Sequence, residues 1–272
     1  MSLVSTEWLE RNISKVKIID SSWHMPNILR NGYEEYKREH IKNAIFFDID
    51  KFSNKKRDLP HMLPGKKDWE EIVSNLGISN EDRIIVYDNS DVFSACRCWY
   101  TFIFFGHKPN LISVLDGGFQ KWKKENRKLT SEKTNIKKNI YVANKLDKLV
   151  KNKDEIEDNI LKKKFKVVDA RSKNRFLGLE KELRPGLRSG SIQNSHSLPF
   201  NEIINKDDKT FLEKKIIKEK FAKLGIIEEN NVVFSCGSGI TAAVLSLAYS
   251  LINDKYLPTV YDGSWAEYGK KN

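Results

Sequence analysis

The chain has 272 residues, of which 39% are hydrophobic and 11% aromatic, so it can bury a core and is not an intrinsically disordered protein. Its formal net charge of +11 indicates a basic surface or a preference for small anions. The sequence lacks zinc-finger spacing, an aromatic RNA-binding signature and a run of arginines on one helix, which argues against a nucleic-acid partner.

The N-terminal stretch, MSLVSTEWLERNISK, mixes charged and polar residues and has no apolar run of signal-peptide length. No other stretch approaches the roughly 18 apolar residues that a membrane-spanning helix needs. The three cysteines form an odd set that does not predict a disulfide scaffold. We therefore expect a cytoplasmic protein without membrane contact, in a reducing compartment, with at least one thiol free to react.

Four motifs of the first half recur in the second half in the same order, each roughly 150 residues later. The pairs are KIIDSSW (17–23) with KVVDARS (166–172), EHIKNAIFFDI (39–49) with SGSIQNSHSLPF (189–200), RIIVYDNSD (83–91) with NVVFSCGSG (231–239), and VLDGGFQKW (114–122) with VYDGSWAEY (260–268). This repetition predicts two copies of one domain, at residues 1–130 and 151–272. The polar, Lys- and Asn-rich residues 131–150 are predicted to be the linker.

Within each copy, short β-branched runs alternate with helical patterns. In the first copy, IIVYD (84–88) predicts a strand, and FSACRCWYTFIFFGH (93–107) predicts a buried helix that ends near Gly106. LISVLDG (111–117) then predicts the next strand, and GFQKWKKEN (118–126) a short helix. The alternation predicts an α/β fold of two tandem domains, each a mostly parallel central sheet flanked by helices. Such sheets bind ligands beyond the carboxyl ends of their strands.

The stretch VVFSCGSGITAAVLSLAYSLI (232–252) places Cys236 between a buried strand and an apolar helix. Gly237 and Gly239 allow the backbone to curl, so that successive amide N–H groups can point inward as an anion-binding nest. The helix that follows adds the positive end of its dipole. These features favour the thiolate, the nucleophilic form of cysteine, so Cys236 is predicted to be a catalytic nucleophile rather than a structural core residue.

The position that matches Cys236 in the first copy is Asp88. A carboxylate cannot replace a thiolate as a sulfur nucleophile, so the first domain is predicted to be catalytically silent. Cys96 and Cys98 follow within the predicted helix, where their spacing points them to different faces. We expect them to be structural residues, with a redox or metal role as the alternative.

Over nearly its whole length the chain resembles the two-domain rhodanese-like sulfurtransferases. The motifs that carry the resemblance are FFDID (46–50), PHMLPG (60–65), DGGFQKW (116–122), RFLG (175–178), RPGLRSGSI (184–192), CGSGIT (236–241) and YDGSWAEYG (261–269). The loop CGSGIT is similar to the CGSGVT of 3-mercaptopyruvate sulfurtransferases, whereas thiosulfate sulfurtransferases carry the basic form CRKGVT. The resemblance therefore favours the mercaptopyruvate branch of the family.

The resemblance implies that Cys236 accepts sulfur and becomes a persulfide. The amides of Gly237, Ser238, Gly239, Ile240 and Thr241 would cradle it.

Two arginines match the substrate-binding arginines of the family. Arg175 and Arg184 would hold the carboxylate and carbonyl end of mercaptopyruvate, because a guanidinium fork matches a planar carboxylate. Arg188 is a weaker candidate at the rim. The Asp169–Arg171 pair is expected to join strand to loop rather than contact substrate.

The resemblance also implies a proton relay formed by Asp50, His61 and Ser238 near the thiol. Asp50 and His61 belong to the first copy of the repeat, so this relay would place the active site at a domain interface.

The predicted enzyme moves sulfur from 3-mercaptopyruvate, a small anionic donor, through Cys236 to a thiol, thioredoxin or cyanide, and releases pyruvate. We expect a monomer that needs neither a metal nor an organic cofactor. Thiosulfate as the donor is one alternative, and a non-catalytic rhodanese-like binding module is another. A cysteine phosphatase is excluded, because its Cys-x5-Arg signature requires an arginine where this chain has Ala242.

Overall fold

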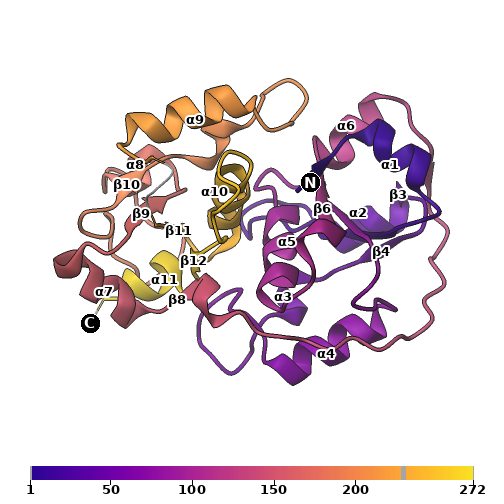
Figure 1. Cartoon of the computed structure of the whole chain (residues 1–272), viewed down its shortest axis with the longest axis horizontal. Helices are drawn as coiled ribbons and strands as arrows, with labels where there is room; N and C mark the ends of the chain where they lie inside the picture. Colours follow the sequence, from indigo (N-terminus) through magenta and orange to yellow (C-terminus); the bar gives the residue numbers. More distant parts are fainter. Residues whose placement is uncertain (1, 228–230, 272) are drawn as a thin grey trace. The chain divides into compact units, whose positions relative to one another are not determined.

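The computed structural model describes residues 2–227 and 231–271 (Figure 1). Residues 1, 228–230 and 272, which include the outer ends of the two predicted domains, lie outside the described residues. The chain divides into two compact units. Unit 1 comprises Met1–Asn54, Leu63–Leu146 and Lys206–Thr210, and unit 2 comprises Lys55–Met62, Asp147–Asn205 and Phe211–Asn272. Each unit thus includes a short segment from the other half of the sequence.

Unit 1 is built on a five-stranded parallel sheet in the order β1-β6-β5-β2-β4. Its strands are β1 (Leu3–Val4), β2 (Lys17–Asp20), β4 (Ala44–Phe46), β5 (Ile84–Tyr87) and β6 (Ile112–Leu115). The short strands β3 (His40–Ile41) and β7 (Leu129–Thr130) pair antiparallel beside it. The central strands β5 and β6 are buried along their whole length, as expected for a sheet covered on both faces.

Unit 2 repeats this sheet with the same strand order, β8-β12-β11-β9-β10, and again every pair is parallel. Its strands are β8 (Val150–Lys151), β9 (Lys166–Asp169), β10 (His196–Ser197), β11 (Val232–Ser235) and β12 (Val260–Tyr261). The predicted α/β fold, with a parallel central sheet flanked by helices in each domain, is confirmed.

The helices alternate with the strands in both units, as Figure 1 shows. Those of unit 1 are α1 (Thr6–Asn12), α2 (Gly32–Arg38), α3 (Ile49–Phe52), α4 (Lys66–Asn75), α5 (Ala95–Phe104), the 3-10 turn η1 (Pro109–Leu111) and α6 (Gly118–Lys124). Those of unit 2 are η2 (Asp147–Leu149), α7 (Lys153–Lys162), α8 (Lys173–Phe176), η3 (Phe200–Ile203), α9 (Lys214–Lys223), α10 (Ile240–Ser250) and α11 (Ser264–Tyr268). No helix within the described ranges is long and apolar enough to cross a membrane.

Helix α5 follows the central strand β5 of unit 1, and α10 follows the central strand β11 of unit 2. These are the most deeply buried helices of their units. Every residue of α5 is buried, which agrees with the apolar helix predicted from residues 93–107. The chain leaves this helix through Gly106, whose φ of 82° lies in the left-handed region that glycine adopts without strain. In each unit the loop that matches Cys236–Gly239 is thus held between a buried strand and a buried helix.

The sequence repeat extends to individual backbone hydrogen bonds. In unit 1 the amide of Ser21 donates to the carbonyl of Tyr87 at 2.9 Å, and in unit 2 the amide of Ala170 donates to the carbonyl of Ser235 at 2.8 Å. These bonds join matching strand ends at the carboxyl edge of each sheet. The two units therefore hold their loops in the same backbone frame.

Part of the predicted linker, residues 131–150, packs against unit 1. Tyr141 and Ala143 are each 2% exposed, and unit 1 extends through Leu146. The amide of Asn144 donates to the carbonyl of Phe105, which fastens this segment to the end of α5.

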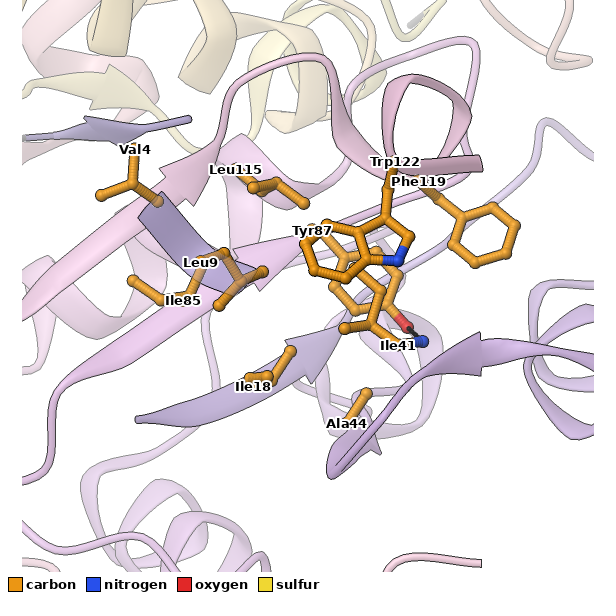
Figure 2. Close-up of a cluster of buried hydrophobic side chains, with 10 residues drawn as sticks. All are labelled: Val4, Leu9, Ile18, Ile41, Ala44, Ile85, Tyr87, Leu115, Phe119 and Trp122. Atoms are coloured by element: carbon orange, nitrogen blue, oxygen red, sulfur yellow. Dashed lines mark hydrogen bonds between the residues drawn. The ribbon is translucent and has the colours of Figure 1, made fainter. Parts of the chain in front are cut away.

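A cluster of apolar side chains fills one face of the unit 1 sheet (Figure 2). Phe119 of α6 packs on Tyr87 of β5 with ring centroids 6.0 Å apart, and the Tyr87 hydroxyl accepts a hydrogen bond from the amide of Ile41 at 3.3 Å. Leu9 of α1 is fully buried in the same cluster. The cluster thus fastens α1 and α6 to the sheet.

We expect Leu9→Ala to lower the free energy of unfolding of unit 1 by about 2–5 kcal/mol, because it removes buried methyl groups and leaves a cavity. Leu29→Ala is the matched control, since Leu29 is fully exposed at 106%. Urea unfolding followed by fluorescence measures both variants. Equal unfolding midpoints for the two variants would contradict this account of the cluster.

Candidate active site

The loop from Cys236 to Gly239 joins the end of β11 to the start of α10. Cys236 is 2% exposed, and its Sγ accepts a hydrogen bond from the amide of Gly239 at 3.1 Å. Gly239 precedes α10 with a φ of 82°, a left-handed conformation that costs an L-residue roughly 1–2 kcal/mol. This conformation turns the amide back toward the sulfur, so the predicted curl of the loop is present.

The backbone on the other side of the loop is held by α11. The amide of Cys236 donates to Ser264 Oγ at 3.2 Å, and the carbonyl of Cys236 accepts from the amide of Trp265 at 2.9 Å. The carbonyl of Gly237 accepts from the amide of Ala266 at 2.9 Å. The first turn of α11 therefore fixes the peptide group that carries the sulfur.

Two predicted binding residues, Arg175 and Arg184, lie over Gly237. A Cβ atom at Gly237 would stand 3.5 Å from Nη2 of Arg175 and 3.7 Å from Nη1 of Arg184. The absence of a side chain at Gly237 lets the two guanidinium groups approach the loop backbone. Two positive charges beside a row of amides make the surroundings of Gly237 favourable for an anion.

Arg175 projects from α8 and is held at one end by Glu182. Its Nη2 donates to Glu182 Oε2 at 2.5 Å, whereas its buried Nε has no hydrogen-bond partner among the described residues. A buried N–H without a partner is costly, so this part of the Arg175 side chain is held at an energetic cost.

His61 and Ser238 come together in unit 2, to which the segment Lys55–Met62 belongs by its packing. His61 Nδ1 lies 2.9 Å from Ser238 Oγ, and each residue is 5% exposed. Arg184 Nη2 donates to the same Oγ at 3.4 Å. The Ser238 oxygen accepts from Arg184, and the tautomer of His61 decides whether the hydroxyl donates to Nδ1 or accepts from it.

Asp50, the third residue of the predicted relay, belongs to unit 1. Its Oδ2 accepts a hydrogen bond from Trp23 Nε1 at 2.8 Å. The role of Asp50 in a relay stays a prediction.

The remaining predicted residues flank this group. Ile240 and Thr241 form the first turn of α10, and the Arg188 guanidinium lies 4.5 Å from the centre of the Trp265 ring. Arg171 pairs with Asp169 at 2.7 Å, with both side chains 1% exposed, as expected for a pair that joins strand to loop.

The matching loop of unit 1 has the same backbone hydrogen bond to the helix that follows the next strand, but it carries the Asp88 carboxyl in place of a thiol. The amide of Phe119 donates to the carbonyl of Asp88 at 2.9 Å, as the amide of Trp265 does to that of Cys236. The Asp88 carboxyl accepts from the amides of Ser90 (3.0 Å) and Ala95 (2.5 Å). The side chain thereby fills its own amide nest.

Cys96 and Cys98 lie inside α5 and are fully buried. Burial raises the pKa of both thiols well above the usual range, so neither is a nucleophile at neutral pH. This agrees with the structural role expected for them.

Sequence reasoning missed two contributors to the site, Glu182 and Ser264. A possible signal for Glu182 was its position between the two predicted arginines, where a carboxylate can pair with either. Ser264 gave no such signal, because its hydroxyl contacts the Cys236 amide from 28 residues away.

We expect Gly239→Ala to slow alkylation of Cys236 by iodoacetamide severalfold, because strain at φ 82° displaces the amide that donates to the sulfur. Gly225→Ala is the matched control, since Gly225 also has a positive φ of 67° but precedes β11 in another loop. Mass spectrometry of the Cys236 peptide measures both rates. Equal rates in the two variants would show that the Gly239 amide does not activate the thiol.

Burial raises the pKa of Asp88 to about 7, although two amide hydrogen bonds act to lower it. Folded unit 1 therefore holds a proton on Asp88 at pH values where the unfolded chain has lost it. The contribution of Asp88 to the free energy of unfolding should therefore fall as pH rises from about 4 to about 7. Asp20, whose pKa burial raises to about 6, adds to this fall.

We expect the free energy of unfolding of Asp88→Asn to fall less, or rise more, than that of the wild type as pH rises from about 4 to about 7, because the substitution removes the Asp88 contribution. Asp68→Asn, at an exposed side chain of α4, serves as the control and should keep the wild-type slope. Urea unfolding at a series of pH values gives the slopes. A wild-type slope in Asp88→Asn would refute the assignment.

Comparison with known proteins identifies the family. A model described as the rhodanese-like domain matches residues 5–125 and 152–271. The chain is 34% identical to the 3-mercaptopyruvate sulfurtransferase of Mus musculus, covering 98% of this chain and 91% of that protein. It is also 34% identical to the thiosulfate sulfurtransferase of Mus musculus, covering 99% and 92%.

Among solved structures, SseA from Escherichia coli, described as a 3-mercaptopyruvate sulfurtransferase with the rhodanese fold, matches with a TM-score of 0.87 at 28% identity. The match covers 97% of this chain and 99% of that one. These relatives are enzymes, and they confirm the predicted class, a sulfurtransferase. With both halves matched by the same domain model and relatives aligned along nearly the whole length, the chain belongs to the rhodanese-like family.

Proposed function

We propose that this sulfurtransferase takes sulfur from 3-mercaptopyruvate, carries it as a persulfide on Cys236 and delivers it to a thiol, thioredoxin or cyanide. The observation that carries the proposal is the position of two guanidinium groups over Gly237, beside a buried thiol that accepts a backbone hydrogen bond.

Cys236 acts as the nucleophile and as the carrier of the transferred sulfur. Its sulfur accepts from the Gly239 amide at the start of α10, where the helix dipole favours negative charge. The same environment stabilises the terminal sulfur anion of a persulfide. No side chain of Gly237 obstructs the additional atom.

Arg175 and Arg184 bind the carboxylate and ketone oxygens of the donor. Their guanidinium N–H groups nearest Gly237, on Arg175 Nη2 and Arg184 Nη1, offer charge-assisted hydrogen bonds to these oxygens. The same charges stabilise the enolate that forms as the carbon–sulfur bond breaks.

In the first step, the Cys236 thiolate attacks the sulfur of mercaptopyruvate and a sulfur–sulfur bond forms. The carbon–sulfur bond breaks, and its electron pair remains on the departing carbon as the enolate of pyruvate. One proton then converts the enolate into pyruvate, and the donor sulfur remains on Cys236 as the outer atom of the persulfide.

The Ser238–His61 pair supplies and returns the proton that this step requires. The 2.9 Å separation of His61 Nδ1 from Ser238 Oγ allows a proton to pass between them, and Arg184 holds the hydroxyl in place.

In the second step, cyanide or a thiolate attacks the outer sulfur. A new bond forms to that sulfur, the sulfur–sulfur bond breaks, and its electron pair returns to Cys236 as the thiolate. The cycle consumes no external oxidant or reductant.

Thiosulfate is a second candidate donor. The two guanidinium groups over Gly237 offer charge to a dianion, and the chain is as similar to a thiosulfate sulfurtransferase as to a mercaptopyruvate enzyme. We nevertheless expect it to be the weaker donor, because Gly237 and Ser238 place no cationic side chain in the loop itself.

Unit 1 is proposed to be catalytically silent, because Asp88 fills the nest that holds sulfur in unit 2. The domain boundaries, the monomeric state and the cytoplasmic compartment stay predictions.

We expect the purified protein to transfer sulfur to cyanide much faster from 3-mercaptopyruvate than from thiosulfate, and Cys236→Ser to abolish both reactions. Thiocyanate and pyruvate formation measure the rates. Mass spectrometry of the protein mixed with donor alone should show one added sulfur atom on the Cys236 peptide.

Cys96→Ser is the matched control, because the same substitution at a fully buried thiol should leave transfer intact. Transfer from thiosulfate alone would reverse the choice of donor. No transfer from either donor, in a folded protein, would favour a binding module.

A further inference from the structure

We propose that Glu182 is a positioning residue that fixes the Arg175 guanidinium over the Cys236 loop, and that it thereby sets the affinity for the donor. This inference rests on the proposed function, since it concerns how the same site holds its anionic substrate.

Glu182 is a buried carboxylate placed between two guanidinium groups. Oε1 accepts from Arg171 Nη1 at 2.6 Å, and Oε2 accepts from Arg175 Nη2 at 2.5 Å. The Glu182 side chain is 1% exposed. A carboxylate so deeply buried is retained only where its charge is paired.

Arg171, the arginine on the other side of Glu182 from Arg175, is anchored to the sheet. Arg171 donates from Nη2 to Asp169 Oδ2 at 2.7 Å and to the carbonyl of Gly190 at 2.8 Å. Asp169 is the last residue of β9, and the Arg171 guanidinium lies 4.4 Å from the centre of the Trp265 ring. Arg171 is thus fixed from several directions and serves as a rigid support.

The charges alternate from Asp169 through Arg171 and Glu182 to Arg175. Because Arg171 has several fixed partners, Glu182 holds Arg175 in one position, and the Nη2 atom that Glu182 binds is also the atom nearest Gly237. Binding then costs little side-chain entropy, since the Arg175 rotamer is ordered before substrate arrives.

A glutamine at position 182 has one oxygen that accepts and one amide that only donates. In the wild type each arginine donates to a different carboxylate oxygen, so in Glu182→Gln the amide NH2 faces one of the two guanidinium groups. Because Arg171 has other fixed partners, the arginine that loses its position is Arg175, the one that contacts substrate.

We expect Glu182→Gln to raise KM for 3-mercaptopyruvate about tenfold, the scale of one charge-assisted hydrogen bond, with kcat changed less than KM. The inhibition constant for pyruvate, a non-reacting keto acid, should rise in parallel.

Glu180→Gln is the matched control. It makes the same substitution two residues away on an exposed side chain, whose hydrogen bond from Ser172 Oγ is long at 3.5 Å. It should keep the wild-type KM and kcat. Thermal unfolding of each variant checks that the fold is intact.

A double-mutant cycle with Arg175→Gln separates positioning from a general structural role. If Glu182 acts through Arg175, adding Glu182→Gln to Arg175→Gln raises KM no further. A purely structural Glu182 would give multiplicative losses in the double variant, and that result would overturn the proposal, as would an unchanged KM in Glu182→Gln.

Glu182→Asp carries the test if Glu182→Gln does not fold. It keeps the charge but is one methylene too short to reach both arginines, so KM should rise while kcat is kept. If the wild-type protein uses neither mercaptopyruvate nor thiosulfate as a donor, the proposed function is refuted. If the wild type is active and both Glu182→Gln and Glu182→Asp keep its KM, only the role of Glu182 is refuted.

Discussion

The contact on which the site depends is the hydrogen bond from the Gly239 amide to the sulfur of Cys236. It requires a left-handed turn directly before α10, and that turn requires the Cys236–Gly237 backbone to stay in place. The first turn of α11 holds this backbone through the carbonyls of both residues. The backbone dipole of the Gly239 amide and the guanidinium groups of Arg175 and Arg184 thus lie beside a buried sulfur, an arrangement that favours negative charge there.

The two units show how one backbone frame can serve two purposes. The carbonyl of Asp88 is held from α6 as that of Cys236 is held from α11, and the strand order of the two sheets is the same. The two loops differ in the side chain that accepts hydrogen bonds from the loop amides. In unit 1 the Asp88 carboxyl accepts from its own loop amides, whereas in unit 2 the Cys236 sulfur accepts from the Gly239 amide, with two guanidinium groups over Gly237.

Much of this organisation could be predicted from the sequence, because parallel strands are apolar along their length and end in conspicuous polar residues. The repeat revealed the duplicated sheet, and the pattern around Cys236 indicated its loop. The function of Glu182 could not be predicted, since a glutamate in a loop of alternating charges reads as a solvated residue until its burial is known. The sequence could not predict that His61 packs in unit 2, because packing between distant segments leaves no periodic pattern.

The exchange of short segments between the two halves has a consequence for the independence of the domains. Residues 55–62 complete unit 2, and residues 206–210 complete unit 1. A fragment that began after the linker would keep the thiol and both arginines but would lack the imidazole beside Ser238. Removal of the first half of the sequence would therefore also remove a segment that packs within unit 2, and removal of the second half would remove residues 206–210 from unit 1.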